Sequence, residues 1–183
     1  MIPIALSIAG SDPSGGAGIQ ADLKTFHQFG VYGEAVITLI TVQNTRRVSR
    51  VDVLDPALIL EQLDAVLEDI PPHAIKTGAL GNRAVVEALA ARLASSPLPF
   101  VLDPVMISKP GAPLLSADDS DCLNRQLLPR TTLATPNLFE AQLLAGRTIT
   151  SLDDAHDAAR AIAAVNGIAA GAGCSVALCC DLV

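Results

Sequence analysis

The stretch from Ser7 to Phe29, SIAGSDPSGGAGIQADLKTFHQF, constrains the fold more than any other part of the chain. An apolar run over residues 4–9 is typical of a buried β-strand, and it stops at Gly10. A loop of small residues follows, and Ala17 then opens a segment whose apolar side chains recur at helical spacing. The sequence therefore predicts a strand, a glycine-rich loop and a helix N-terminus in direct succession.

The glycines of this loop are typical of a ligand-binding turn. Gly15, Gly16 and Gly18 permit positive φ angles and let a ligand approach the main chain closely. We therefore expect backbone N–H groups of the loop and of the first helical turn to face a ligand, with the positive end of the helix dipole behind them. A turn that only packs the helix on the sheet would explain the same glycines equally well.

Two nucleotide-binding motifs can be tested against this loop. A P-loop requires a lysine directly after its last glycine, whereas Lys24 lies inside the predicted helix. Residues 16–21 satisfy the dinucleotide fingerprint, but the strand ends well before them. The next strand ends in Gln43 and Asn44 instead of the acidic residue that would hold a ribose. A nicotinamide-dependent dehydrogenase is therefore the least favoured of the interpretations considered.

Composition narrows the class of protein. The 183 residues suffice for a single domain, and half of them are hydrophobic. A formal net charge of −7 argues against nucleic acid or an anionic membrane as the main partner, and no apolar run reaches membrane length. The N-terminus lacks the positive flank of a secretory signal. The four cysteines are not spaced as a metal site, so a cytoplasmic protein is expected.

Strand and helix patterns alternate along the chain, which predicts an α/β fold with a mostly parallel sheet and helices on both faces. The tail over residues 165–183 contains no Lys or Arg, adds at most one strand at 175–182, and would leave the sheet short on one side. Strands are expected at 4–9, 35–42, 48–54, 73–76, 100–102 and 132–134, and helices at 17–29, 56–70, 83–94, 117–128, 138–146 and 152–164.

Polar residues gather at the C-terminal ends of the predicted strands, where open α/β sheets bind their ligands. Each set has a simple structural explanation: Asp12 can cap a turn, and Asn137 with Glu140 forms a capping-box pair. Five sets at consecutive strand ends are harder to explain in this way. They are Ser11 with Asp12, Gln43 to Thr45, Lys76 with Thr77, Asp103, and Asn137 with Glu140.

Phosphoryl transfer is the chemistry that best suits such a rim. A nucleotide requires Mg²⁺, for which Asp103 and Glu140 are the candidate carboxylates. The amide of Gln43 can both donate to and accept from a heterocycle. The three histidines are scattered, so neither a Ser-His-Asp arrangement nor a zinc site is apparent.

Several motifs in order resemble the hydroxymethylpyrimidine/phosphomethylpyrimidine kinase family of the ribokinase-like superfamily. They are AGSDPSGGAGIQADLKTF, VQNT, KTG, VLDPVM with KPGAPLL, and TPNLFEAQLL, and the resemblance covers residues 4–164 of a single domain spanning 1–183. The resemblance implies a three-layer ribokinase-like fold. It also implies ATP- and Mg²⁺-dependent phosphorylation of 4-amino-5-hydroxymethyl-2-methylpyrimidine and of its monophosphate in thiamine biosynthesis.

The resemblance also implies site residues on the pyrimidine side. Gln43 corresponds to the side chain that reads the pyrimidine, with Asp22 beside the same substrate. Ala79 stands where many relatives have methionine, which implies a roomier wall of the pocket. The loop glycines that would surround the substrate are Gly10, Gly15, Gly16 and Gly18.

On the nucleotide side, Asp103 corresponds to the acidic residue near the phosphates, and Asn137 with Glu140 to the motif that supports the Mg²⁺–nucleotide. The metal ligands implied are Glu140 and Asp103, directly or through water. Residues 171–174, GAGC, resemble the family's Gly-Thr-Gly-Cys loop and make Cys174 the candidate catalytic residue. They follow Asn137 much sooner than in the family, so a chance likeness in an Ala/Gly-rich tail is the favoured interpretation.

The sequence thus predicts a pyrimidine pocket beside an incomplete nucleotide site, with substrate recognition retained and weak or no kinase activity. The resemblance further implies a homodimer. Two alternatives remain open, a pyridoxal kinase, which shares fold and chemistry, and a non-catalytic pyrimidine-binding protein.

Overall fold

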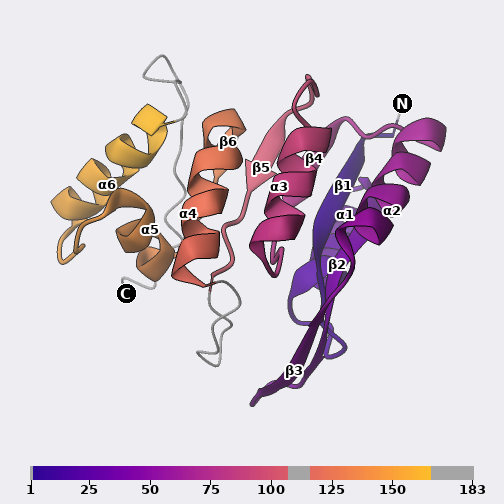
Figure 1. Cartoon of the computed structure of the whole chain (residues 1–183), viewed down its shortest axis with the longest axis horizontal. Coiled ribbons are helices and arrows are strands. Elements are labelled where there is room, and N and C mark those ends of the chain that lie inside the picture. The colour runs from indigo at the N-terminus through magenta and orange to yellow at the C-terminus, as the bar shows by residue number, and fades with distance from the viewer. Residues whose placement is uncertain (1, 107–115, 166–183) are drawn as a thin grey trace.

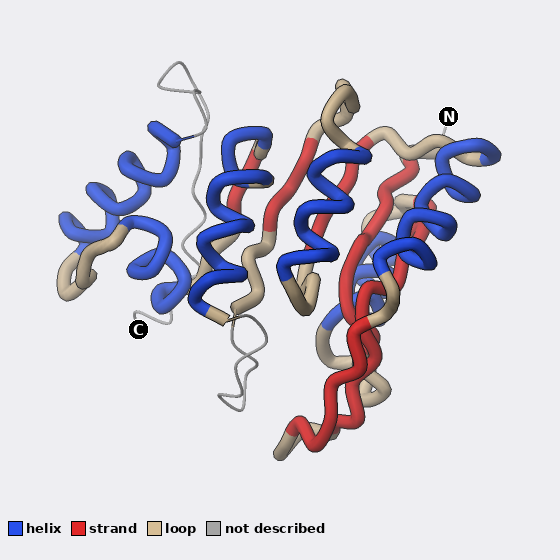
Figure 2. Tube along the Cα trace, in the orientation of Figure 1, coloured by secondary structure: helices blue, strands red, loops and turns tan. Residues whose placement is uncertain are grey.

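The computed structural model describes residues 2–106 and 116–165, and within them the chain forms one twisted six-stranded sheet (Figures 1 and 2). The strand order is β3-β2-β1-β4-β5-β6, so the first strand of the chain lies inside the sheet, between β2 and β4. All neighbouring strands are parallel except β2 and β3, which form an antiparallel ribbon. The strands are β1 (Ile4–Ser11), β2 (Tyr32–Gln43), β3 (Val48–Val53), β4 (Ala74–Thr77), β5 (Phe100–Leu102) and β6 (Leu133–Ala134).

Helices cover both faces of the sheet, as predicted. The alternation along β1 sends Leu6 and Ile8 into the core beneath α2 and α3, and sends Ser7 toward α1, where it donates to Asp22. Figure 1 shows α2, α3 and α4 side by side on the near face. The helices are α1 (Gly18–Gln28), α2 (Pro56–Asp69), α3 (Arg83–Arg92), α4 (Ala117–Gln126), the 3₁₀ turn η1 (Leu128–Arg130), α5 (Leu138–Ala145) and α6 (Leu152–Val165).

The main difference from the predicted elements is the length of β2. It begins at Tyr32, three residues before the apolar run, because its first residues pair with β1 from the Ile4–Tyr32 register onward. It also includes Gln43, which pairs with Val48 of β3. The long β2 and β3 together project beyond the rest of the sheet (Figure 1).

Side-chain caps fix where several helices begin. Asn82 accepts a hydrogen bond from the N–H of Val85 at the start of α3. Complete capping boxes open α4, with Ser116 and Asp119, and α5, with Asn137 and Glu140. The sequence prediction for these three helix starts is therefore confirmed. The predicted strand at 175–182 lies outside the described residues.

One carboxylate is buried in the fold without a partner for one of its oxygens. Glu34, on the N-terminal half of β2, is 9 % exposed, and its Oε2 accepts no hydrogen bond. Burial raises the pKa of Glu34, and the charge of Asp69 raises it further. Because the folded state then binds the proton more tightly than the unfolded chain does, the ionised group destabilises the fold above its folded pKa.

We therefore expect Glu34→Gln to increase the free energy of unfolding at pH 7 by about 1 kcal/mol. The gain should disappear as the pH falls through the folded pKa of Glu34, where the wild-type side chain is already neutral. Urea unfolding at several pH values measures this difference. Asp69→Asn, which removes only the neighbouring charge, should give a smaller gain, and a loss of stability in Glu34→Gln at pH 7 would contradict the prediction.

No helix in residues 2–106 and 116–165 is long and apolar enough to cross a membrane.

Candidate functional site

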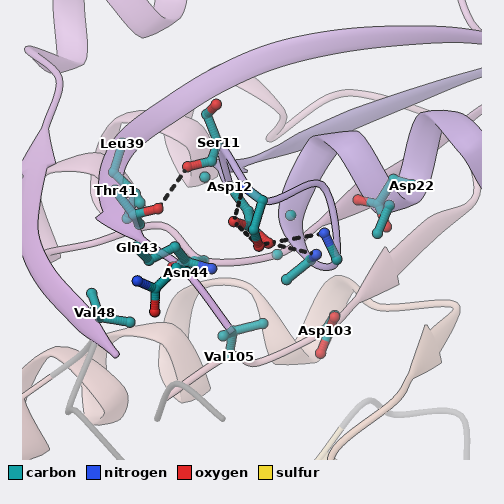
Figure 3. Close-up of a pocket in the computed structure, with 18 of the residues that line it drawn as sticks. Ser11, Asp12, Asp22, Leu39, Thr41, Gln43, Asn44, Val48, Asp103 and Val105 are labelled. Atoms are coloured by element: carbon teal, nitrogen blue, oxygen red, sulfur yellow. Dashed lines mark hydrogen bonds between the residues drawn. The ribbon is translucent and has the colours of Figure 1, made fainter. Parts of the chain in front are cut away.

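A cavity of about 570 Å³ opens at the C-terminal ends of the strands, as predicted for an open α/β sheet. Its volume lies in the range of small-molecule sites. It is bounded by the glycine loop, by the start of α1, by the ends of β2, β4 and β5, and by the turn of the β2–β3 ribbon (Figure 3). The polar side chains lining it are Ser11, Asp12, Ser14, Asp22, Thr41, Gln43, Asn44, Thr45, Lys76 and Asp103.

The glycine loop is organised by the carboxylate of Asp12. Asp12 Oδ2 accepts from the N–H groups of Gly16 and Ala17 at 3.0 and 2.9 Å, and Oδ1 accepts from the N–H of Ser14 at 2.8 Å. The N–H of Gly15 donates to the carbonyl of Asp12. Burial raises the pKa of Asp12, but these hydrogen bonds outweigh it and hold the pKa below its usual value.

This arrangement corrects one prediction. We expected the N–H groups of the loop and of the first turn of α1 to face a ligand, yet Asp12 accepts from those of Gly16 and Ala17, so the prediction is wrong for these two donors. The turn-capping explanation for Asp12 was therefore right. Because an internal carboxylate already fills the loop, these donors cannot also bind an anion of the ligand.

Gly18 allows the loop to close on the end of β1. Its φ is +56°, and a Cβ built on it would lie 2.1 Å from the carbonyl oxygen of Gly10. Lys24 returns from α1 to the same loop, where its Nζ donates to the carbonyl of Gly15 at 2.8 Å. Lys24 lies inside α1 and binds the loop backbone, so the loop is not a P-loop, but nothing in the sequence predicted this contact.

Three charged side chains meet across the floor of the cavity. Lys76, near the end of β4, donates to Asp22 of α1, with its Nζ 2.9 Å from Oδ2 and 3.0 Å from Oδ1. The same Nζ lies 3.3 Å from Oδ2 of Asp103, which follows β5. The hydroxyl of Ser7, fully buried on β1, donates to Asp22 Oδ2 at 2.6 Å. Asp22 is therefore held from two strands at once.

The sequence analysis did not predict the central position of Lys76 in this group of charges. Its position at a strand end was noticed, but nothing in the sequence showed that it would join Asp22 to Asp103. Burial raises the pKa of Asp103 above its usual value, Lys76 opposes that rise, and the charge of Asp22 adds to it. The positive charge of Lys76 thus offsets the repulsion between the carboxylates of Asp22 and Asp103, both of which lie close to its Nζ.

The opposite wall of the cavity comes from the β2–β3 ribbon. Gln43, Asn44 and Val48 lie there, across from Asp22 and Asp103 in the view of Figure 3. The hydroxyl of Thr41 donates to the carbonyl of Ser11 at 3.0 Å and ties this wall to the end of β1. No protein hydrogen bond to the Gln43 side chain is seen among the described residues, so its amide is available to a ligand.

Asn137 and Glu140 do not line the cavity but lie beside it. Glu140 is almost fully buried, and its two oxygens accept from the N–H groups of Met106 at 3.2 Å and Asn137 at 2.9 Å. The Asn137 side chain caps α5 through the N–H of Glu140. Burial raises the pKa of Glu140 against these backbone hydrogen bonds, and the charge of Asp103 adds to the rise. The carboxylates of Glu140 and Asp103 therefore interact electrostatically.

The remaining predicted residues divide into two groups. Gly10, Gly16, Gly18 and Ala79 line the cavity, whereas Gly15 lies in the loop beside it. Cys174 lies outside the described residues. Within the described ranges, no set of three or more His, Cys, Asp or Glu side chains is arranged to hold a metal ion by itself.

The family model described as phosphomethylpyrimidine kinase matches residues 12–176. The chain is 51 % identical over 161 residues to the hydroxymethylpyrimidine/phosphomethylpyrimidine kinase of Synechococcus elongatus, covering 88 % of this chain and 61 % of that protein. The chain therefore spans about three fifths of the length of the curated relatives it matches.

Two solved structures show how far the fold is shared. The phosphomethylpyrimidine kinase of Clostridium difficile superposes with a TM-score of 0.83 at 43 % identity, covering 89 % of this chain and 71 % of that one. The pyridoxal kinase of Staphylococcus aureus, solved with AMP-PCP and pyridoxal, gives a TM-score of 0.80 at 37 % identity, covering 90 % and 60 %.

The sheet order, the helices on both faces and the cavity at the strand ends define a ribokinase-like α/β protein, the fold of these small-molecule kinases. The predicted fold class is thereby confirmed. Within that class, the chain belongs to the phosphomethylpyrimidine kinase family.

Proposed function

We propose that this chain binds 4-amino-5-hydroxymethyl-2-methylpyrimidine and its monophosphate, and that it takes part in their ATP-dependent phosphorylation in thiamine biosynthesis. The observation that carries the proposal is the cavity, which sets the free amide of Gln43 across from the carboxylate of Asp22. The family membership supports the same reaction.

The two side chains complement an aminopyrimidine. A carboxylate accepts hydrogen bonds from an exocyclic amino group, and an amide both donates to and accepts from ring-edge atoms. Asp22 is already fixed by Ser7 and Lys76, so it is pre-organised for this role. The small residues Gly16, Gly18 and Ala79 line the walls and leave room for a planar ring.

The nucleotide and Mg²⁺ would lie beside Asp103. Mg²⁺ usually keeps several waters and uses one or two carboxylates together with substrate phosphates. Asp103 and Glu140 fit that pattern because they are two carboxylates whose charges interact. Both oxygens of Glu140, however, already accept hydrogen bonds from backbone N–H groups. We propose that Asp103 holds the hydrated ion and that Glu140, with Asn137, positions it through water. The bound ion would neutralise charge on the nucleotide phosphates.

Two alternatives remain. A pyridoxal kinase is supported by the likeness to the Staphylococcus aureus enzyme at 37 % identity, whereas curated pyrimidine kinases match this chain at 47–51 % identity. A pyrimidine-binding protein without kinase activity requires only the Gln43 and Asp22 side of the cavity. Cys174 as catalytic residue, a homodimer and a cytoplasmic location also remain proposals.

We expect calorimetric titration with 4-amino-5-hydroxymethyl-2-methylpyrimidine to show binding that weakens at least tenfold in Gln43→Ala, because the buried ring would lose its amide partner. Gln28→Ala, at the exposed end of α1, should bind like the wild type. A parallel ATP-turnover assay separates a kinase from a binding protein. Tighter binding of pyridoxal than of the pyrimidine would favour the pyridoxal alternative, and a folded protein that binds neither would refute the proposal.

A further inference from the structure

The turn at the end of the β2–β3 ribbon carries two adjacent arginines, Arg46 and Arg47. Both are exposed, and Asn44 and Thr45 before them and Val48 after them line the cavity. The turn is shaped by Asn44, whose Oδ1 accepts from the N–H groups of Arg46 at 2.9 Å and Arg47 at 3.1 Å. The backbone, not the guanidinium groups, therefore forms the turn, and both side chains stay available at the rim.

These two side chains differ from every other cation in residues 2–106 and 116–165. Of the eleven lysines and arginines in these ranges, the other nine each bind a carboxylate or a backbone carbonyl. The guanidinium groups of Arg46 and Arg47 form neither an ion pair nor a hydrogen bond within these ranges, where only the backbone N–H groups of the two residues bind a side chain, that of Asn44. In a chain with 19 acidic and 12 basic residues, two neighbouring cations without a carboxylate partner are unexpected.

The lining of the cavity beside the two arginines carries a net negative charge. Its charged lining consists of Asp12, Asp22 and Asp103 against a single cation, Lys76, which is already bound by two of those carboxylates. The loop N–H groups of Gly16 and Ala17 are occupied by Asp12. The carboxylates inside the cavity would therefore repel an anionic ligand. The cations that are still available to bind it, Arg46 and Arg47, lie at the rim.

We propose that Arg46 and Arg47 recruit the phosphoryl group of a phosphorylated heterocyclic substrate, and so favour a phosphate monoester over the corresponding alcohol. This inference rests on the proposed function. A phosphate monoester carries close to two negative charges at neutral pH and accepts paired hydrogen bonds from guanidinium groups. Cations at the mouth of a cleft also raise the local concentration of an anion and its association rate.

The test compares two ligands that differ only in the phosphate: 4-amino-5-hydroxymethyl-2-methylpyrimidine and its monophosphate. Calorimetric titration of the full chain and of Arg46→Gln/Arg47→Gln is made at 50 and 300 mM NaCl. Because exposed charge pairs each contribute modestly, we expect the dissociation constant of the monophosphate to rise about three- to tenfold in the variant at low salt, and less at high salt. Binding of the alcohol should stay within about twofold.

Arg125→Gln/Arg160→Gln is the matched control. It removes the same net charge from α4 and α6, where both arginines form exposed ion pairs away from the cavity. Equal weakening in the control would mean that only net charge matters and would overturn the proposal. So would equal loss of both ligands in the Arg46/Arg47 variant, or weakened binding of ATP alone. If the wild type binds neither pyrimidine, the proposed function itself fails and this inference falls with it.

Discussion

Gly18→Ala is expected to disrupt the cavity more than the same change at any other glycine in residues 2–106 and 116–165. The new Cβ would lie 2.1 Å from the carbonyl oxygen of Gly10, a backbone atom that cannot move without shifting the end of β1. The positive φ of +56° adds strain for any residue with a side chain. We expect a loss of roughly 2–4 kcal/mol in the free energy of unfolding and loss of pyrimidine binding. Urea unfolding and calorimetric titration measure the two effects.

Gly30→Ala is a control that introduces the backbone strain of a positive φ without a steric clash. Gly30 also has a positive φ, +70°, but a Cβ built there meets nothing within 4 Å. That variant should lose only about 1 kcal/mol and bind normally. If the two variants were equally stable and bound equally well, the close approach of Gly18 to Gly10 would not be what shapes the loop.

Lys76→Met should have the largest effect among changes to charged residues. It leaves Asp22 and Asp103 facing each other without their shared cation, on side chains that are only 18 % and 30 % exposed. Breaking a buried ion pair from one side destabilises by 3–5 kcal/mol, and the partial exposure here reduces the expected loss to about 2 kcal/mol at pH 7. Displacement of Asp22 should also weaken pyrimidine binding at least tenfold.

The pH dependence of this variant has a definite sign. Without Lys76 to oppose burial, the folded pKa of Asp103 should rise further above its usual value. A carboxyl group with a raised folded pKa destabilises the fold at neutral pH and less so as the pH falls through that pKa. The stability deficit of Lys76→Met should therefore shrink on acidification.

Two variants control for this interpretation. Lys24→Met removes an exposed lysine that binds a single carbonyl and should lose less than about 0.5 kcal/mol. Asp22→Asn combined with Lys76→Met should lose less than the sum of the two single changes, because the two side chains interact directly. Additive losses in the double variant would show that Lys76 does not act through Asp22.

Most of the fold could be read from the sequence because its signals are local. The apolar runs of β1 and β2 and the capping residues Asn82 and Asn137 depend on neighbours a few residues away. The first three residues of β2 were missed because they are stabilised by pairing with β1, which no local pattern reports.

The site was predicted in outline but not in its contacts. That polar strand ends would gather at one edge follows from parallel strands alone. The link between Asp22 and Lys76 joins residues 54 positions apart, and their geometry depends on the packing of α1 on the sheet. The loop was misjudged for a related reason, since Asp12 competes with any ligand for the same N–H groups. The sequence does not show which acceptor would bind these N–H groups.

The interior position of β1 has a consequence for how the protein is made. β1 pairs with β2 on one side and with β4 on the other, and residues 12–73 separate its end from the start of β4. At about 5–20 residues per second, the ribosome needs roughly 3–12 s to supply that second neighbour. For that interval the apolar strand Ile4–Ser11 of the nascent chain carries an open edge, which is a template for aggregation. Chaperone contact with the N-terminal strand during synthesis should therefore raise the yield of folded protein.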